Sequence, residues 1–176
     1  LICGLFFVHG LNIISGDAFT YEPAQTGAQK DTRRKIVDVF IVQPVNEDFL
    51  DEGLWARYTA DLAGYLNRLR AGERREVQGD LLKRVANVLH EETHFPAGDF
   101  VPTLYPIEIQ IDNDLSDRHT VLQIEAPDTF GFLYELSNAL ALNRVYIDRV
   151  TIDSTGSRVH DVLFVSDENG RKIVDG

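Results

Sequence analysis

The chain contains no methionine and only one cysteine, Cys3, among its 176 residues. One cysteine cannot form a disulfide within the chain, so a disulfide framework is excluded, and we expect a reducing, cytoplasmic environment. Positive charge is also scarce, with 17 Lys and Arg against 28 Asp and Glu and a net charge of −11. No basic cluster offsets this balance locally, which argues against nucleic acid or a membrane surface as a partner.

Long hydrophobic runs are missing as well. No apolar run approaches the roughly 20 residues that a helix needs to span a bilayer. The opening segment, residues 1–11, is too short for that and lacks the basic residues that begin a signal peptide. Because the chain has no methionine and begins at Leu1, we expect it to be a piece of a longer polypeptide.

The sequence does have the composition of a globular protein with a core, at 44% hydrophobic and 26% charged residues. Its most regular stretch is residues 118–170. Alternating β-rich runs, leucines at helical spacing and a turn-forming STGS segment predict, in order, a strand, a helix and a two-stranded hairpin. We expect these elements at residues 120–126, 133–142, 145–152 and 159–165, with the hairpin turn at 154–157.

The two ends of the chain resemble each other. Residues 5–20 parallel residues 139–154, and the VDVFIV run that follows the first parallels the HDVLFV run that follows the second. Such a repeat indicates two copies of one module. Asp38 and Asp161 then take matching positions, where a charge within a strand is typical of a pair with arginine or of a backbone cap.

The first copy is expected to continue beyond its matching part. Helical and strand patterns predict a helix at 1–8, strands at 11–19 and 35–42, helices near 54–69 and 81–89, and a strand at 105–111. Gly72 and Gly79 are expected to bracket the linker between the two later helices. The strand at 105–111 is expected to close the first module.

This β-α-β-β order and two short motifs resemble the ACT domain, a ferredoxin-like regulatory module that binds small ligands, commonly amino acids. DTFGFL at 128–133 resembles the family's D-R-P-G-L-L turn, and HDVLFV at 160–165 resembles its D-V-F-x-V strand. The resemblance implies an α/β fold of the α+β sandwich type, with tandem βαββαβ modules and antiparallel sheets. We expect the modules at residues 1–112 and 113–176.

Both modules are expected to be incomplete. The first lacks its opening strand and carries an extra helix at about residues 73–95, and the second lacks its last helix and strand. Incomplete modules expose strand edges and apolar surface, so we expect them to pair with each other or, as a homodimer, with a second chain.

The junction at residues 107–140, with its DNDLS segment at 112–116, is similar to that between the C-terminal ACT domains of bacterial PII uridylyltransferases. This resemblance implies a regulatory region that senses an amino acid, glutamine foremost, for catalytic domains upstream in the same chain. The PII protein would be a partner through that parent enzyme. The alternative is a stand-alone ACT-repeat protein that binds a ligand or dimerises.

Two turns are the candidate ligand sites that the resemblance implies. In the second copy, a glycine allows close backbone approach, and the helix that follows offers N–H groups to a carboxylate. In the first copy, a G-x-N-I turn offers an amide as donor and acceptor. The residues are Asp128, Gly131, Phe132 and Leu133 in the second copy, and Gly10, Asn12 and Ile13 in the first. The alternatives are Asp128 as a helix cap and Asn12 as a solvent-facing turn residue.

A literal H-E-x-x-H motif begins at His90, where His90 and His94 could bind zinc with Glu91 as general base. Glu92 places a charge where such helices carry an apolar residue, and Pro96 ends the helix almost at once. We therefore interpret the motif as a solvated helix end and expect no metal site, no bound cofactor and no catalytic residue in this chain.

Overall fold

The structure is a computed structural model that describes residues 1–21, 35–45, 52–90 and 107–174. Within these ranges the chain forms four helices and six strands in an α+β arrangement, which confirms the predicted fold class. The elements are α1 (Ile2–Val8), β1 (Leu11–Tyr21), β2 (Lys35–Pro44), α2 (Leu54–Arg70), α3 (Arg74–His90), β3 (Glu108–Asp112), β4 (Thr120–Pro127), α4 (Phe132–Leu142), β5 (Tyr146–Thr155) and β6 (Arg158–Ser166).

The chain divides into two compact units, which are described separately below. Unit 1 consists of Leu1–Ile13, Val42–Leu104 and Phe130–Glu135, and unit 2 of Ile14–Ile41, Tyr105–Thr129 and Leu136–Gly176. Both β1 and α4 therefore begin in unit 1 and continue in unit 2. The predicted boundary between modules at residue 112 stays a prediction.

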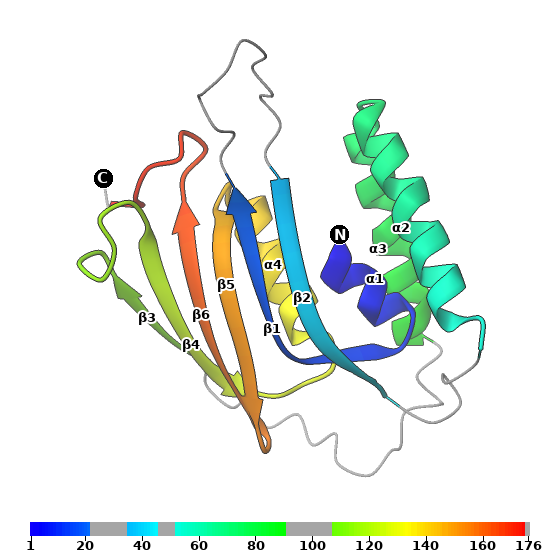
Figure 1. Cartoon of the computed structure of the whole chain (residues 1–176), viewed down its shortest axis with the longest axis horizontal. Helices are drawn as coiled ribbons and strands as arrows, with labels where there is room; N and C mark the ends of the chain where they lie inside the picture. The colour runs from blue at the N-terminus through cyan, green and yellow to red at the C-terminus, as the bar shows by residue number, and fades with distance from the viewer. Residues whose placement is uncertain (22–34, 46–51, 91–106, 175–176) are drawn as a thin grey trace. The chain divides into compact units, whose positions relative to one another are not determined.

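Unit 2 is built on one six-stranded sheet with the order β2-β1-β5-β6-β4-β3, seen as a row of arrows in Figure 1. The registers of the β1–β5, β5–β6, β4–β6 and β3–β4 pairs are all antiparallel, as the sequence predicts. Alternate residues of the central strands lie on one face and form its core. The buried residues of this face include Leu122, Ile124 and Ala126 of β4 and Val159, Leu163 and Val165 of β6.

The internal repeat predicted from sequence is present in the backbone. Adding 134 to the last residue of α1, Val8, gives the last residue of α4, Leu142. The same shift carries Gly10, with φ of 66°, onto Arg144, the one non-glycine residue with positive φ in the described part (57°). Equivalent helices thus end in equivalent left-handed turns before equivalent strands.

The strands β1 and β5, which are equivalent in the repeat, pair with each other. Ser15 pairs with Asp153 and Phe19 with Arg149, and the repeat relates each of these pairs to the other. Asp17 pairs with its own counterpart, Thr151, and the Thr151 hydroxyl donates a hydrogen bond to Asp17 Oδ1 at 2.9 Å. The pairing therefore has local two-fold symmetry centred on Asp17 and Thr151.

Two expectations about connections are wrong. The strand predicted to close the first module, β3, pairs instead with β4, because a short connection between neighbouring antiparallel strands favours their direct pairing. Gly79 lies inside α3, not in the linker. Gly72, with φ of 91°, forms the turn between the helices. Gly79 is tolerated inside α3 because a glycine in an exposed helix lowers the stability by only about 1 kcal/mol.

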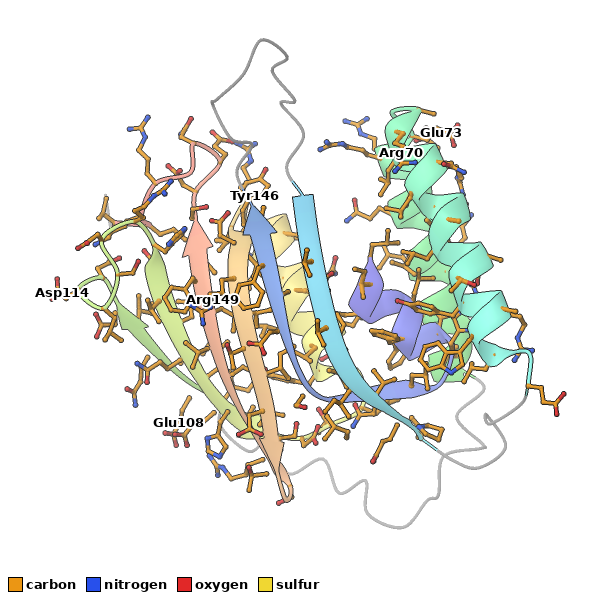
Figure 2. All side chains as sticks on the ribbon, in the orientation of Figure 1. Arg70, Glu73, Glu108, Asp114, Tyr146 and Arg149 are labelled. Carbon is orange, nitrogen blue, oxygen red and sulfur yellow. The ribbon has the colours of Figure 1, made fainter. Side chains whose placement is uncertain are left out.

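Unit 1 is built from α1, α2 and α3, with the first turn of α4 in the same unit. The apolar faces predicted for these helices are buried in part. The buried residues include Leu5 and Phe6 of α1, Tyr58 and Tyr65 of α2, and Leu81 and Val85 of α3, whereas Leu66 and Leu82 are exposed. Phe6 stacks on Tyr58 with ring centroids 4.8 Å apart. Arg68 of α2 joins the helix pair at its turn through Glu73 (2.9 Å), which Figure 2 labels, and through Asp80 (2.5 Å).

No helix within the described ranges is long and apolar enough to cross a membrane.

The contact of Gly16 on β1 with β2 predicts a measurable effect on stability. A Cβ at Gly16 would lie 2.6 Å from the Val39 carbonyl oxygen and would also collide with the Phe40 ring. Because backbone must move to relieve this contact, Gly16→Ala should lower the free energy of unfolding by about 1–3 kcal/mol in chemical denaturation. Gly64→Ala is the control: it lies in α2 with nothing within 4 Å, and should raise stability by up to about 1 kcal/mol. Equal effects of the two changes would contradict the packing described.

Candidate functional site

The turn between β4 and α4 is shaped by a glycine that no other residue could replace without strain. Gly131 has φ of 87°, and its carbonyl accepts the first helical hydrogen bond, from the Glu135 N–H at 3.0 Å. A Cβ at Gly131 would lie 2.6 Å from the Phe7 ring. The turn needs glycine both for its conformation and for this close approach.

Aromatic rings surround that turn within unit 1. Phe7 of α1 stacks on Phe130 with centroids 4.3 Å apart and lies 6.1 Å from Tyr134. Phe132, predicted as a ligand-binding residue, is 9% exposed and belongs to the core, while Leu133 is half-buried. Of these predicted residues, Gly131 and Leu133 therefore lie nearest to the surface of the turn.

Asp128 precedes the turn and belongs to unit 2. Its backbone N–H donates to the Ser157 carbonyl at 2.8 Å, which ties the end of β4 to the β5–β6 hairpin. Its carboxylate is half-buried. Its two predicted roles, as a partner of a ligand's ammonium group and as a cap for α4, stay predictions.

The first-copy turn lies at the end of α1. Gly10 has φ of 66°, its N–H donates to the Phe7 carbonyl at 3.0 Å, and its carbonyl accepts from Val45 at 2.9 Å. Ile13 is buried, and Asn12 is half-buried with no side-chain hydrogen bond to a described residue. Gly10 and Ile13 therefore have structural roles, and Asn12 is the polar residue of this turn that a ligand could engage.

Asp161 on β6 is the most unusual ionisable group of unit 2. It is 1% exposed, and neither carboxylate oxygen has a hydrogen-bond partner among the described residues. Burial raises the pKa of Asp161 to about 7, and the charges of Asp128 and Asp153 add to the rise. The backbone of Asp153 acts to lower the pKa of Asp161, but it forms no hydrogen bond with either carboxylate oxygen. The expected arginine partner or backbone cap is absent from the described part of the chain.

Asp38, the counterpart of Asp161 on β2, shows the same tendency. Burial raises the pKa of its carboxyl, and its Oδ1 atom has no hydrogen-bond partner among described residues. Both copies of the module thus place an aspartate on a strand where its charge is unfavourable.

A second polar cluster in unit 1 was not predicted from the sequence. Asp61 Oδ2 on α2 lies 3.0 Å from His9 Nε2 at the end of α1 and 2.6 Å from Arg84 Nη2 on α3. Burial raises the pKa of Asp61, but hydrogen bonds to Arg84 and His9 and their charges outweigh it, so the net shift is downward. The three residues are 52 and 23 positions apart, so no local pattern could have revealed them.

This cluster lines a cavity of about 460 Å³. Its polar lining is His9, Arg57, Asp61 and Arg84, and its apolar lining is Val8, Leu54 and Ala60. We call it the His9 cavity. The one signal in the sequence that touches it is the spacing of Arg57 and Asp61, which are four residues apart and share a face of α2.

The H-E-x-x-H motif lies mostly outside the described residues. His90 is the last residue of α3, and residues 91–94 are not described. Among the residues that are described, no group of three potential metal ligands occurs.

Comparison with known protein families gives a match to the C-terminal part of the chain. Residues 108–176 match the family model described as an ACR9-like, ACT-like domain. This segment is therefore similar to ACT-like domains. It contains β3, β4, α4, β5 and β6, with the Gly131 turn and Asp161.

Three curated relatives share the name bifunctional uridylyltransferase/uridylyl-removing enzyme. The protein of Erythrobacter litoralis is 30% identical over 79% of this chain and 14% of its own length. The protein of Cereibacter sphaeroides is 36% identical over 39% of this chain and 7% of its own length. The protein of Nitrobacter winogradskyi is 28% identical over 59% of this chain and 12% of its own length. The chain thus spans about one seventh or less of these relatives. No solved structure matches it.

The buried charge of Asp161 predicts an unusual pH dependence of stability. Its pKa is about 7 in the folded state and near 4 when unfolded, so its favourable contribution is complete below pH 4 and is lost as the pH rises to 7. Asp161→Asn should therefore stabilise the protein at pH 8, by at most about 4 kcal/mol, and have little effect at pH 4.

Chemical denaturation between pH 4 and pH 8 measures this difference. The exposed Asp114, labelled in Figure 2, supplies the control, since Asp114→Asn removes the same charge from a surface loop. Its effect on unfolding should be small and nearly independent of pH. An Asp161→Asn protein that is less stable than the parent at pH 8 would show that the carboxylate has a stabilising partner.

Proposed function

We propose that this chain is an amino-acid-sensing regulatory region, with glutamine as its ligand, that acts on catalytic domains elsewhere in the same polypeptide. The chemistry of those domains would be that of a uridylyltransferase. The proposal includes a cytoplasmic location and the PII protein as the eventual target. The chain itself would bind and transmit, without catalysing a reaction.

The observation that carries this proposal is the two-fold pairing of the equivalent strands β1 and β5. A regulatory module must convert a small binding energy into a change that a distant site can detect. Because one sheet runs through both copies, a ligand that moves the strands of one copy would also move the strands of the other. The name of the relatives supports the kind of enzyme, and the ACT-like match supports a resemblance to modules that commonly bind amino acids.

The candidate ligand groups have the right chemistry for a free amino acid. The Asp128 carboxylate would take the ammonium group, and the backbone at Gly131 would accommodate the ligand closely because no Cβ intervenes. In the separate turn of the first copy, the Asn12 amide would donate to or accept from a polar group of a ligand bound there. The first turn of α4 favours a carboxylate electrostatically.

Titration calorimetry with a panel of amino acids tests the proposal. Glutamine should bind saturably, and Asp128→Ala or Asn12→Ala should weaken it about tenfold or more, because each removes a hydrogen bond or ion pair to a charged or polar ligand group. Asp114→Ala, an acidic loop residue outside both turns, should bind as the parent does. Absence of saturable heat with every amino acid would contradict a sensor.

A second candidate function, homodimerisation, is favoured by the edge strand β3. Ile109 and Ile111 pair with Ile124 and Leu122 and so lie on the same face as the core, yet they are 50% and 67% exposed. A stripe of β-branched residues on an edge strand is a surface for another copy of the chain.

Sedimentation velocity over a range of concentrations tests this association. The parent chain should dimerise, and Ile109→Lys should shift the equilibrium to monomer, because it places a charge in the apolar stripe. Leu115→Lys is the matched control, since Leu115 is equally exposed but lies in the loop after β3. A monomeric parent at all concentrations would exclude this function.

A further inference from the structure

The geometry points to a second ligand site, the His9 cavity, and we propose that it binds a small α-amino acid by its carboxylate and its amino group. The inference rests on the proposed function only for the class of ligand. Its location, between α1, α2 and α3 of unit 1, shares no residue with either predicted turn.

The size of the cavity suits a metabolite. Its volume of about 460 Å³ lies within the roughly 300–1,000 Å³ of small-molecule sites, and far exceeds the roughly 30 Å³ that one water occupies. Its lining combines an apolar side, formed by Val8, Leu54 and Ala60, with four convergent polar side chains. A few polar groups on an apolar wall are the usual composition of such sites.

The arginines of the lining suit a carboxylate. Arg57 and Arg84 both line the cavity, beside the carboxylate of Asp61. Arg84 is held by Asp61, whose Oδ2 atom lies 2.6 Å from Arg84 Nη2. A guanidinium has five N–H donors, so this pair leaves donors on Arg84 for a ligand. Arginine binds carboxylates through paired, charge-assisted hydrogen bonds.

Asp61 supplies the opposite charge for an amino group. Its Oδ2 atom accepts from both His9 and Arg84, whereas its Oδ1 atom has no hydrogen-bond partner among the described residues. An ionised carboxylate can accept about four hydrogen bonds, so Oδ1 is open to an ammonium group. His9 is itself only 9% exposed and packs edge-on against Tyr58. Its contact therefore fixes the position of Asp61.

The simplest competing explanation is an ion pair that only fastens α2 to α3. The chain contains a matched example of that role in Arg68, which joins the same two helices through Glu73 and Asp80 but does not line the cavity. Arg68→Gln therefore separates loss of an interhelical ion pair from loss of a ligand group. Arg57→Gln complements it, because Arg57 is exposed and its replacement leaves the Asp61–Arg84 pair intact.

The test is titration of the whole chain with glutamine, followed by calorimetry and by the emission of Trp55. Trp55 is the only tryptophan, is next to Leu54 of the lining and packs against Tyr58. Glutamine should change its emission. Arg57→Gln and Arg84→Gln should each weaken binding about tenfold or more, and Arg68→Gln should not. Two analogues of glutamine, glutaramate without the amino group and 4-aminobutanamide without the carboxylate, should both bind more weakly.

The outcomes separate this site from the predicted turns. Binding that Arg57→Gln weakens and Asp128→Ala does not supports the cavity and places the ligand away from the β4–α4 turn. Binding that only Asp128→Ala weakens overturns the cavity site and leaves the proposed function standing. Two molecules bound per chain, each lost with its own variant, support both. If glutamine does not bind at all, both the cavity site and the proposed function are overturned. If Arg84→Gln and Arg68→Gln weaken binding equally, and each lowers the melting temperature in proportion, Arg84 has a structural role only and the cavity site is overturned.

Discussion

The antiparallel pairing of β1 with β5 is the interaction on which the organisation of unit 2 depends. It joins the strand pair of the first copy to the three strands β5, β6 and β4, with β3 beyond them (Figure 1). Because Asp17 faces its own counterpart, Thr151, the two copies meet through the same surface of the module. Such an isologous contact lets one strand sequence serve both sides of a junction. The Arg149 side chain reinforces it, lying 5.1 Å from the Phe19 ring and 5.2 Å from Phe164.

The sheet that runs through both copies contains aspartates whose burial is unfavourable to their charge. Each copy carries an aspartate on the strand after its hairpin, and in the second copy Asp161 lies among Ile124 and other core residues without a hydrogen bond to any described group. A buried, unsatisfied carboxylate destabilises a fold unless it is protonated or finds a partner. The charge of Asp128, which precedes the β4–α4 turn, adds to the cost of ionising Asp161, so protonation of Asp161 shifts the stability of the fold.

Unit 1 has a different physical basis. Its helices are held by stacked aromatic rings and by ion pairs that link α2 with α1 and α3. His9, which fixes Asp61 in the cavity, directly precedes Gly10, whose carbonyl holds Val45. A ligand in the His9 cavity would thus act one peptide bond from the turn that contains Asn12. Short-range connection of this kind would let two sites in one chain influence each other through the end of α1.

The sequence alone determined most of the secondary structure and the repeat, because both depend on the local spacing of apolar residues and glycines. The strands at β1, β2, β4, β5 and β6, the helix after Gly131 and the two-residue hairpin around Gly156 all follow from alternation, leucine spacing and glycine placement. The resemblance to the ACT family also rests on local motifs, and the match over residues 108–176 agrees with it.

Only the tertiary structure decided which partners those elements take. The pairing of β3 with β4, the isolation of Asp161, and the convergence of His9, Asp61 and Arg84 each join residues that no local pattern connects. Gly79 illustrates the same limit, since a glycine within a helix and one in a linker look alike in sequence, and packing of the surrounding helix decides between them. The periodicity of apolar residues predicts which face of a helix or strand is buried. Which distant segment covers that face depends on the tertiary packing.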